Sequence, residues 1–244
     1  MTVTVALDPT DTSLTARDAP VVDAGAELDR QLHRLIDLGY GELTGLGDAD
    51  LRDAVESLRP TVVARTSAMP APAPSAVPFV VVLAPRLTPP ARTMPLIIRG
   101  ARSPKPGFVS PDTADIDRFT PIDGVDVPDV DAYLLLDVHR GDEYLSWRPD
   151  DALPVITGRG RTPLTVHEGI ALVTLVPEAL EKNRCFMLLG SRCGDRRVPA
   201  LWISGGSARD GGSVRRGAAK LGWCWAGNLH TWLGHASAAA RLAG

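Results

Sequence analysis

Hydrophobic positions near the start of the chain repeat with the period of an α-helix. Four apolar residues are spaced so that they line one face of such a helix: Leu28, Leu32, Leu35 and Ile36. Gly39 suits its C-terminal cap. A second short helix is predicted from Asp48 to about Pro60, with three residues facing inward: Leu51, Val55 and Leu58.

Short apolar runs beyond residue 78 predict strands, because they are rich in β-branched and aromatic residues and are bounded by turn residues. The predicted strands are Phe79 to Leu83, Leu96 to Ile98, Tyr133 to Val138, Tyr144 to Trp147, Phe186 to Leu189 and Val198 to Ile203. The last two are expected to form a hairpin. Between them and the earlier strands, the capping-box spacing of Thr165 and Glu168 predicts a helix that ends near Pro177. The alanine-rich end of the chain is expected to form a short helix.

These elements divide the chain into four segments. We expect a flexible tail over residues 1–24, a helical segment over 25–66, a stiff Pro/Ala linker over 67–78 and a body over 79–244. Helices and strands do not alternate as they do in a doubly wound sheet. The predicted fold is therefore α+β, with a mixed or antiparallel sheet and the N-terminal helices packed on one side.

Composition places the protein among ordinary globular proteins. Its 244 residues are 44% hydrophobic and 23% charged, with a formal net charge of -3, which makes nucleic acid an unlikely partner. No apolar run is long enough for a transmembrane helix, and the first residues do not resemble a secretory signal. An odd count of three cysteines does not indicate a disulfide framework. We therefore expect reduced thiols and a cytoplasmic protein. The oligomeric state is left open.

Rare residue types cluster near the C-terminus, and this clustering motivates the leading functional hypothesis. Eight residues are expected to form a small-molecule pocket: Trp202, Trp223, Trp225, Asn228, His230, Asp195, Arg196 and Arg197. In that hypothesis His230 is a catalytic acid or base, and Asp195 is its partner. The arginines and tryptophans would bind an anionic or aromatic metabolite. Alternatively, the tryptophans only anchor the core.

The cysteines allow two further hypotheses. Cys224 could act as a nucleophilic thiolate with His230 as its base, but on a strand it would face away from Trp223 and Trp225. Four residues could also bind a structural zinc ion: Cys185, Cys193, Cys224 and His230. Their spacing lacks the tight C-x2-C knuckle that strong zinc motifs share.

Charge is distributed unevenly along the sequence. Residues 184–220 hold eight basic and two acidic residues, whereas residues 107–151 hold twelve acidic and three basic residues. The two regions could face each other or be solvated. They could also contact a macromolecule, which would make the chain a non-enzymatic partner-binding protein. An anion site near Arg192, Arg196 and Arg197 is the third possibility.

Several segments resemble a family of uncharacterised actinobacterial proteins, a domain-of-unknown-function family. The most specific are SRCGDRRVPALWIS and GWCWAGNLHTWLG, and the resemblance covers about residues 26–237. The loop over 205–217 looks like an addition to the family pattern. The resemblance implies a soluble bacterial protein and transfers no catalytic residue, cofactor or activity.

Overall fold

A computed structural model describes residues 23–66, 75–100 and 103–244. Residues 1–22 and 67–74, which include most of the expected tail and linker, lie outside the described ranges. The N-terminal helices are α1 (Ala24–Asp37), α2 (Tyr40–Thr44), α3 (Gly47–Glu56) and α4 (Arg59–Thr66). The predicted amphipathic helix is confirmed, because α1 buries Leu28, Leu32 and Leu35. Pro60 does not end the second helix but lies in the first turn of α4, where proline is well tolerated.

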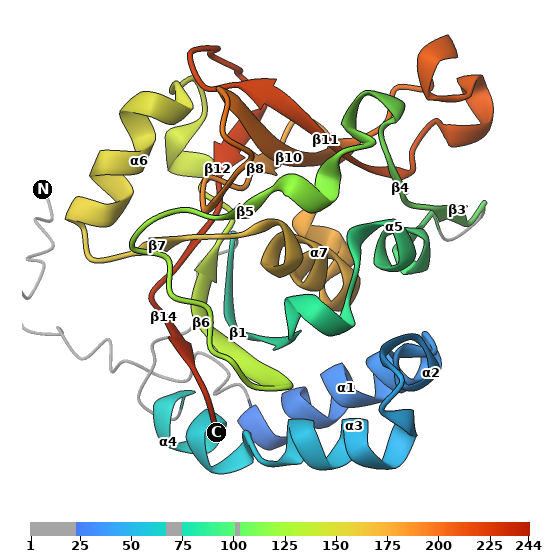
Figure 1. The fold of residues 1–244 in the computed structure, drawn as a ribbon, viewed down its shortest axis with the longest axis vertical. Coiled ribbons are helices and arrows are strands. Elements are labelled where there is room, and N and C mark those ends of the chain that lie inside the picture. Colours follow the sequence, from blue (N-terminus) through green and yellow to red (C-terminus); the bar gives the residue numbers. More distant parts are fainter. Residues whose placement is uncertain (1–22, 67–74, 101–102) are drawn as a thin grey trace, which may run out of the picture.

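The first sheet lies against these helices (Figure 1). It has the order β1-β6-β13-β7, and β14 also pairs with β6. Its strands are β1 (Ala76–Leu83), β6 (Ala132–His139), β7 (Thr162–Pro163), β13 (Ser237–Ala238) and β14 (Ala240–Leu242). Every pairing in it is antiparallel.

The second sheet is mixed and has the order β12-β8-β10-β11-β4. Its strands are β4 (Phe108–Val109), β8 (Cys185–Met187), β10 (Arg197–Ile203), β11 (Ala219–Trp225) and β12 (Leu233–His235). The antiparallel pairing of β8 with β10 confirms the predicted hairpin. The α+β class is likewise confirmed.

Short elements connect and flank the sheets. Two small ladders pair β2 (Ile98–Arg99) with β3 (Lys105–Pro106) and β5 (Thr120–Pro121) with β9 (Ser191–Arg192). The remaining α-helices are α5 (Pro90–Thr93), α6 (Pro149–Gly158) and α7 (Val166–Leu175). Among the described residues, no helix has both the length and the apolar character needed to cross a membrane.

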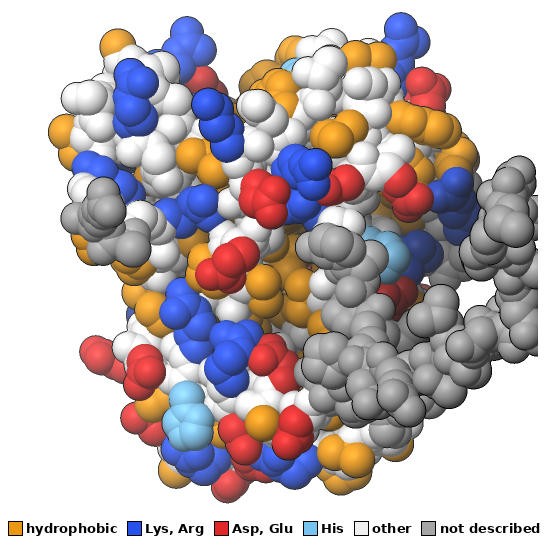
Figure 2. Space-filling view, turned by 180° about the vertical axis from the view of Figure 1, so that it is seen from behind, with side chains coloured by type: hydrophobic (Ala, Val, Ile, Leu, Met, Phe, Trp, Pro, Cys, Tyr) orange, Lys and Arg blue, Asp and Glu red, His pale blue; other side chains and the backbone are white. Residues whose placement is uncertain are grey.

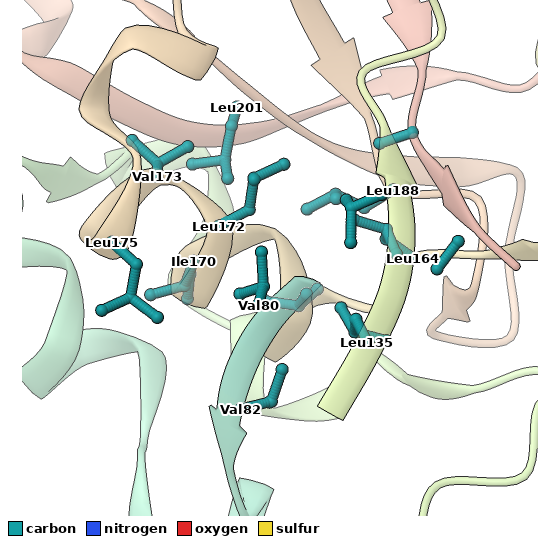
Figure 3. Close-up of a cluster of buried hydrophobic side chains, with 14 of the residues drawn as sticks. Val80, Val82, Leu135, Leu164, Ile170, Leu172, Val173, Leu175, Leu188 and Leu201 are labelled. Carbon is teal, nitrogen blue, oxygen red and sulfur yellow. The ribbon is translucent and has the colours of Figure 1, made fainter. Parts of the chain in front are cut away.

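Helix α7 is the central element of the core, because it contacts both sheets (Figure 3). Ile170 and Leu172 lie near Val80 of β1, while Val173 lies near Leu201 of β10. The predicted capping box starts this helix: the Thr165 Oγ1 accepts from the Glu168 backbone, and the Glu168 carboxylate accepts from the Thr165 backbone. A locally encoded helix start thus positions the element on which both sheets pack.

Glu168 also forms a buried ion pair with Arg241 of β14. Its two carboxylate oxygens accept four hydrogen bonds, from Tyr133 Oη (2.9 Å), Thr165 N (2.7 Å), Arg241 Nε (2.6 Å) and Arg241 Nη2 (2.8 Å). The guanidinium also donates to the Thr162 hydroxyl and to the Pro163 carbonyl. The buried charges are therefore paired and hydrogen-bonded, as burial requires.

This ion pair helps to explain why the prediction of a C-terminal helix is wrong. Instead of a helix, the alanine-rich end forms β13 and β14, which pair with β6. Alanine is a strong helix former, but tertiary contacts such as the one between Arg241 and Glu168 override that preference. Two predicted strands are also wrong or misplaced. A 3-10 turn occupies Asp142–Tyr144, and Met94–Leu96 is helical, so that only Ile98–Arg99 pairs.

Gln31 of α1 covers the open edge of β1. Its side-chain Nε2 donates to the Phe79 carbonyl (3.0 Å), and its Oε1 accepts from the Val81 amide (2.8 Å). Gln31 is fully buried. These two bonds satisfy backbone groups that an edge strand would otherwise leave unpaired.

We expect Q31L to lower the free energy of unfolding by about 2–4 kcal/mol, because it leaves a buried N–H and a buried C=O unpaired. Denaturant unfolding followed by circular dichroism measures the change. H33A, at an exposed position of the same helix, is the control and should stay within about 0.5 kcal/mol of the wild type. Equal effects of Q31L and H33A would contradict the role of Gln31.

R241M is expected to lower the free energy of unfolding by about 3–5 kcal/mol, because it leaves the Glu168 carboxylate buried without a counter-charge. The double variant E168Q/R241M removes that charge and should recover part of the loss. Denaturant unfolding of the wild type, R241M and E168Q/R241M tests this, and a double variant no more stable than R241M would exclude charge burial as the cause.

Candidate functional site

The eight residues predicted to form a pocket do not meet in one place. Strands β10 and β11 pair in the register Arg197 with Trp225, Pro199 with Trp223 and Trp202 with Lys220. Because side chains alternate along a strand, Arg197, Trp223 and Trp225 lie on one face of the sheet. Trp202 lies on the other face, with Cys224. The sheet itself therefore divides the predicted pocket.

On the first face, Arg197 fastens a connecting segment to the sheet. Its guanidinium makes a bidentate ion pair with Asp115 (2.9 and 2.7 Å) and contacts the Asp195 carboxylate (2.8 Å). It also lies over the Trp223 ring, whose Nε1 donates to the Asp112 carbonyl (2.9 Å). These contacts occupy the N–H groups of the Arg197 guanidinium and give this side chain a structural role.

Asp195 is not the partner of His230. Its carboxylate accepts from the Arg197 backbone, from the Arg197 side chain and from the Cys193 thiol (3.2 Å). The Arg197 backbone hydrogen bond is the main reason that the pKa of Asp195 lies below its usual range. The Asp195 carboxylate is thus occupied by Cys193 and Arg197, and among the described residues no hydrogen bond joins it to His230.

On the second face, aromatic rings form a row beside His230. Trp202 packs edge-on against Trp232 (6.3 Å between centroids), and Trp232 packs edge-on against His230 (5.5 Å). Burial lowers the pKa of His230, and its Nε2 has no hydrogen-bond partner among the described residues. The other two predicted residues are at the surface: Arg196 pairs with Asp150 (2.7 Å), and Asn228 is exposed.

The two oppositely charged regions of the sequence partly neutralise each other. Four ion pairs join them: Arg184–Asp142, Arg196–Asp150, Arg197–Asp115 and Arg209–Asp112. Half of the eight basic residues counted between 184 and 220 are thus paired with the acidic stretch. This internal pairing weakens the hypothesis that the charges contact a macromolecule.

The residues considered for zinc are also dispersed. Within the described ranges, no group of three or more His, Cys, Asp or Glu side chains is placed to hold a metal ion. The Cys185 thiol donates to the Glu181 carbonyl (3.4 Å), and Cys193 contacts Asp195 and Arg197. Burial raises the pKa of Cys224 to about 11, so that this cysteine is a thiol and not a nucleophilic thiolate at neutral pH.

A cavity of about 130 Å³ opens elsewhere, where the start of β1 and the end of β6 meet the end of α7. Its apolar wall consists of Ala76, Val77, Val138, Leu172, Val176 and Ala179. Its polar lining residues are Ser75, Arg140, Glu178 and Glu181. On the face of the molecule shown in Figure 2, hydrophobic side chains floor a hollow that charged side chains surround.

Arg140, at the wall of this cavity, is already neutralised. It is 5% exposed and makes a bidentate ion pair with Asp142 (2.7 Å for each bond). One further N–H group donates to the Ala179 carbonyl (3.2 Å), and the Glu181 carboxylate lies 3.5 Å away. Glu178 has no ion-pair partner among the described residues. The charged side chains that line the cavity are therefore two carboxylates and one guanidinium, a net charge of -1.

Sequence reasoning missed this cavity because its lining comes from three separated segments, 75–77, 138–140 and 172–181. One signal was present: Arg140 directly follows the largely apolar strand 132–139, at a point where the chain turns through Gly141. A charged residue at the end of such a strand is rarely buried unless it is paired.

His235 is the most strongly perturbed histidine in the structure. It is completely buried, its Nε2 lies 3.3 Å from the Trp147 carbonyl oxygen, and burial lowers its pKa to about 4. It stays neutral in the folded protein at any pH above that value. It therefore contributes a pH-dependent penalty to folding, not a catalytic charge.

Comparison with known proteins identifies a family but no relative of known activity. The model of a family of unknown function (DUF5701) matches residues 34–244, and the chain belongs to this family. This confirms the resemblance seen in the sequence. No curated protein and no solved structure matches the chain.

We expect the stability of the protein to fall between pH 7 and pH 5. The unfolded chain protonates His235 near pH 6.5, whereas the folded chain protonates it only near pH 4, so the loss is about 2 kcal/mol by pH 5. H235F removes this contribution and should flatten the dependence, which urea unfolding at the two pH values measures. H33A should retain the wild-type slope, and an unchanged slope in H235F would contradict the assignment.

Proposed function

We propose that this member of the DUF5701 family binds a small molecule that joins an apolar body to a positively charged amine. The observation that carries the proposal is the cavity at the ends of β1 and β6, with its apolar floor and its two glutamates at the rim. Concave, mostly apolar sites with a few convergent polar groups are the usual form of small-molecule sites.

The charge of the rim supports an amine as the ligand's polar group. Asp142 holds the Arg140 guanidinium in a bidentate pair, so this cation has little capacity left for a ligand carboxylate. Glu178 and Glu181 line the same cavity, and Glu178 has no ion pair within the described part of the chain. An ammonium group at the rim would pair with these carboxylates.

The volume limits the apolar part of the ligand. A cavity of about 150 Å³ in an apolar core holds a benzene molecule. The cavity here has about 130 Å³ and opens to the surface, so it suits a body of about six carbon atoms with the amine outside. A branched or aromatic monoamine has this shape.

Binding has more support than catalysis. Among the described residues, those that line the cavity include no histidine, cysteine or lysine, and Ser75 is the only one of them with a hydroxyl group. The earlier hypothesis of a biosynthetic enzyme with His230 as acid or base has less support, because its proposed partner Asp195 is bound to Arg197. All three cysteines are free, which supports a reducing compartment such as the cytoplasm.

Benzylamine is the probe that tests the proposal, with benzyl alcohol and benzoate as neutral and anionic comparators of the same size. We expect benzylamine to bind most tightly in ligand-observed NMR titrations. An exposed ion pair contributes about 1 kcal/mol, so E178Q should weaken benzylamine binding roughly five-fold and leave benzyl alcohol unaffected.

Two further variants make the test specific. A179L adds volume to the wall of the cavity and should weaken both benzylamine and benzyl alcohol. E42Q, an exposed glutamate of α2 outside the cavity, is the matched control and should change neither. Equal binding of the three probes, or an E178Q protein that binds benzylamine like the wild type, would refute the proposal.

A further inference from the structure

The glycine-rich segment over 205–217 forms an ordered projection beside β4 (Figure 1). It contains two 3-10 turns, at Ala208–Asp210 and Gly212–Arg215. Its Asp210 makes an ion pair with Lys220 (2.6 Å), and the Ser207 hydroxyl donates to the same carboxylate (2.8 Å). Both members of this ion pair are largely buried, which fixes the base of the projection to β11.

A groove of about 460 Å³ runs between this projection and the segment that leads into β4. Three prolines (Pro95, Pro104 and Pro106) line it, together with Phe108 and Val214. Val214 is 72% exposed, the most exposed of the large hydrophobic side chains in the described part of the chain. The volume lies within the range of small-molecule sites, roughly 300–1,000 Å³.

Two cations also line the groove, Lys105 and Arg215. Neither has an ion-pair partner among the described residues, although most arginines of the body are paired. The Arg215 guanidinium lies 4.3 Å above the Phe108 ring. A cation–π contact leaves the N–H groups of the guanidinium available, and the described residues accept no hydrogen bond from them.

The acidic groups near Arg215 are already occupied. Asp210 is bound to Lys220 and Ser207, and Asp112 is paired with Arg209. Arg215 therefore combines a fixed orientation with unused donors, beside an exposed apolar surface. Guanidinium groups with free N–H donors suit oxyanions such as carboxylates and sulfonates.

We propose that this groove is a second binding site, which takes small molecules that carry an anionic group on an apolar body. The apolar body would lie against Phe108, Val214 and the prolines, while the anion pairs with Arg215 and Lys105. The proposal is independent of the cavity at β1 and β6, which has the opposite charge preference and none of the same lining residues.

The probe for this site is 8-anilinonaphthalene-1-sulfonate, followed by its fluorescence, with N-phenyl-1-naphthylamine as a similar molecule without the charge. R215Q and K105Q should each weaken binding of the sulfonate roughly five-fold, which is the effect of losing one partly exposed ion pair. The double variant R215Q/K105Q should weaken this binding by more than ten-fold. Binding of the uncharged amine should change less than two-fold. High salt should also weaken binding of the sulfonate, because it screens the ion pairs.

R216Q is the matched control, because Arg216 is the exposed neighbour of Arg215 and does not line the groove. Circular dichroism and thermal unfolding verify that each variant is folded. The proposal is overturned if R215Q/K105Q binds the sulfonate as tightly as the wild type does. It is also overturned if R216Q lowers the sulfonate affinity as much as R215Q does. Displacement of the fluorophore by tetraglutamate but not by 1-naphthoate would also overturn it, since the groove would then bind acidic peptides.

Discussion

The buried ion pair between Glu168 and Arg241 sets the relation between helix α7 and the first sheet. Through one carboxylate it joins the start of α7, the beginning of β6 at Tyr133 and the last described strand, β14. Because α7 packs on both sheets, its position also determines where Leu172 and Val176 stand at the wall of the cavity. The cavity near one end of α7 thus depends on a polar contact near the other end.

Elements with a strong local signal could be predicted from the sequence. Helix α1 has an apolar face with regular spacing, and α7 has a capping box, so that contacts within a few residues specify each of them. The end of the chain could not be predicted in this way. Its alanines favour helix, and the contact that decides the outcome joins Arg241 to a residue 73 positions away.

The predicted site shows a different limitation. Trp202, Trp223 and Arg197 are close in sequence and are all rare or chemically versatile, but proximity on paired strands does not place side chains on one face. The alternation that separates them is a property of the strands and could have been applied to every residue of the cluster. Ion pairs between residues far apart in the sequence, such as Arg197 and Asp115, could not be predicted, because residue spacing carries no information about them.

The bond pattern of Gln31 has a consequence for how the chain associates. Its side-chain amide makes the two hydrogen bonds that the backbone of a neighbouring strand would make, so α1 occupies the place of a further strand at β1. A fragment that begins at β1 would present this row of backbone groups to solvent. Such a fragment would be a template for strand addition between molecules, and α1 covers part of that template in the intact chain.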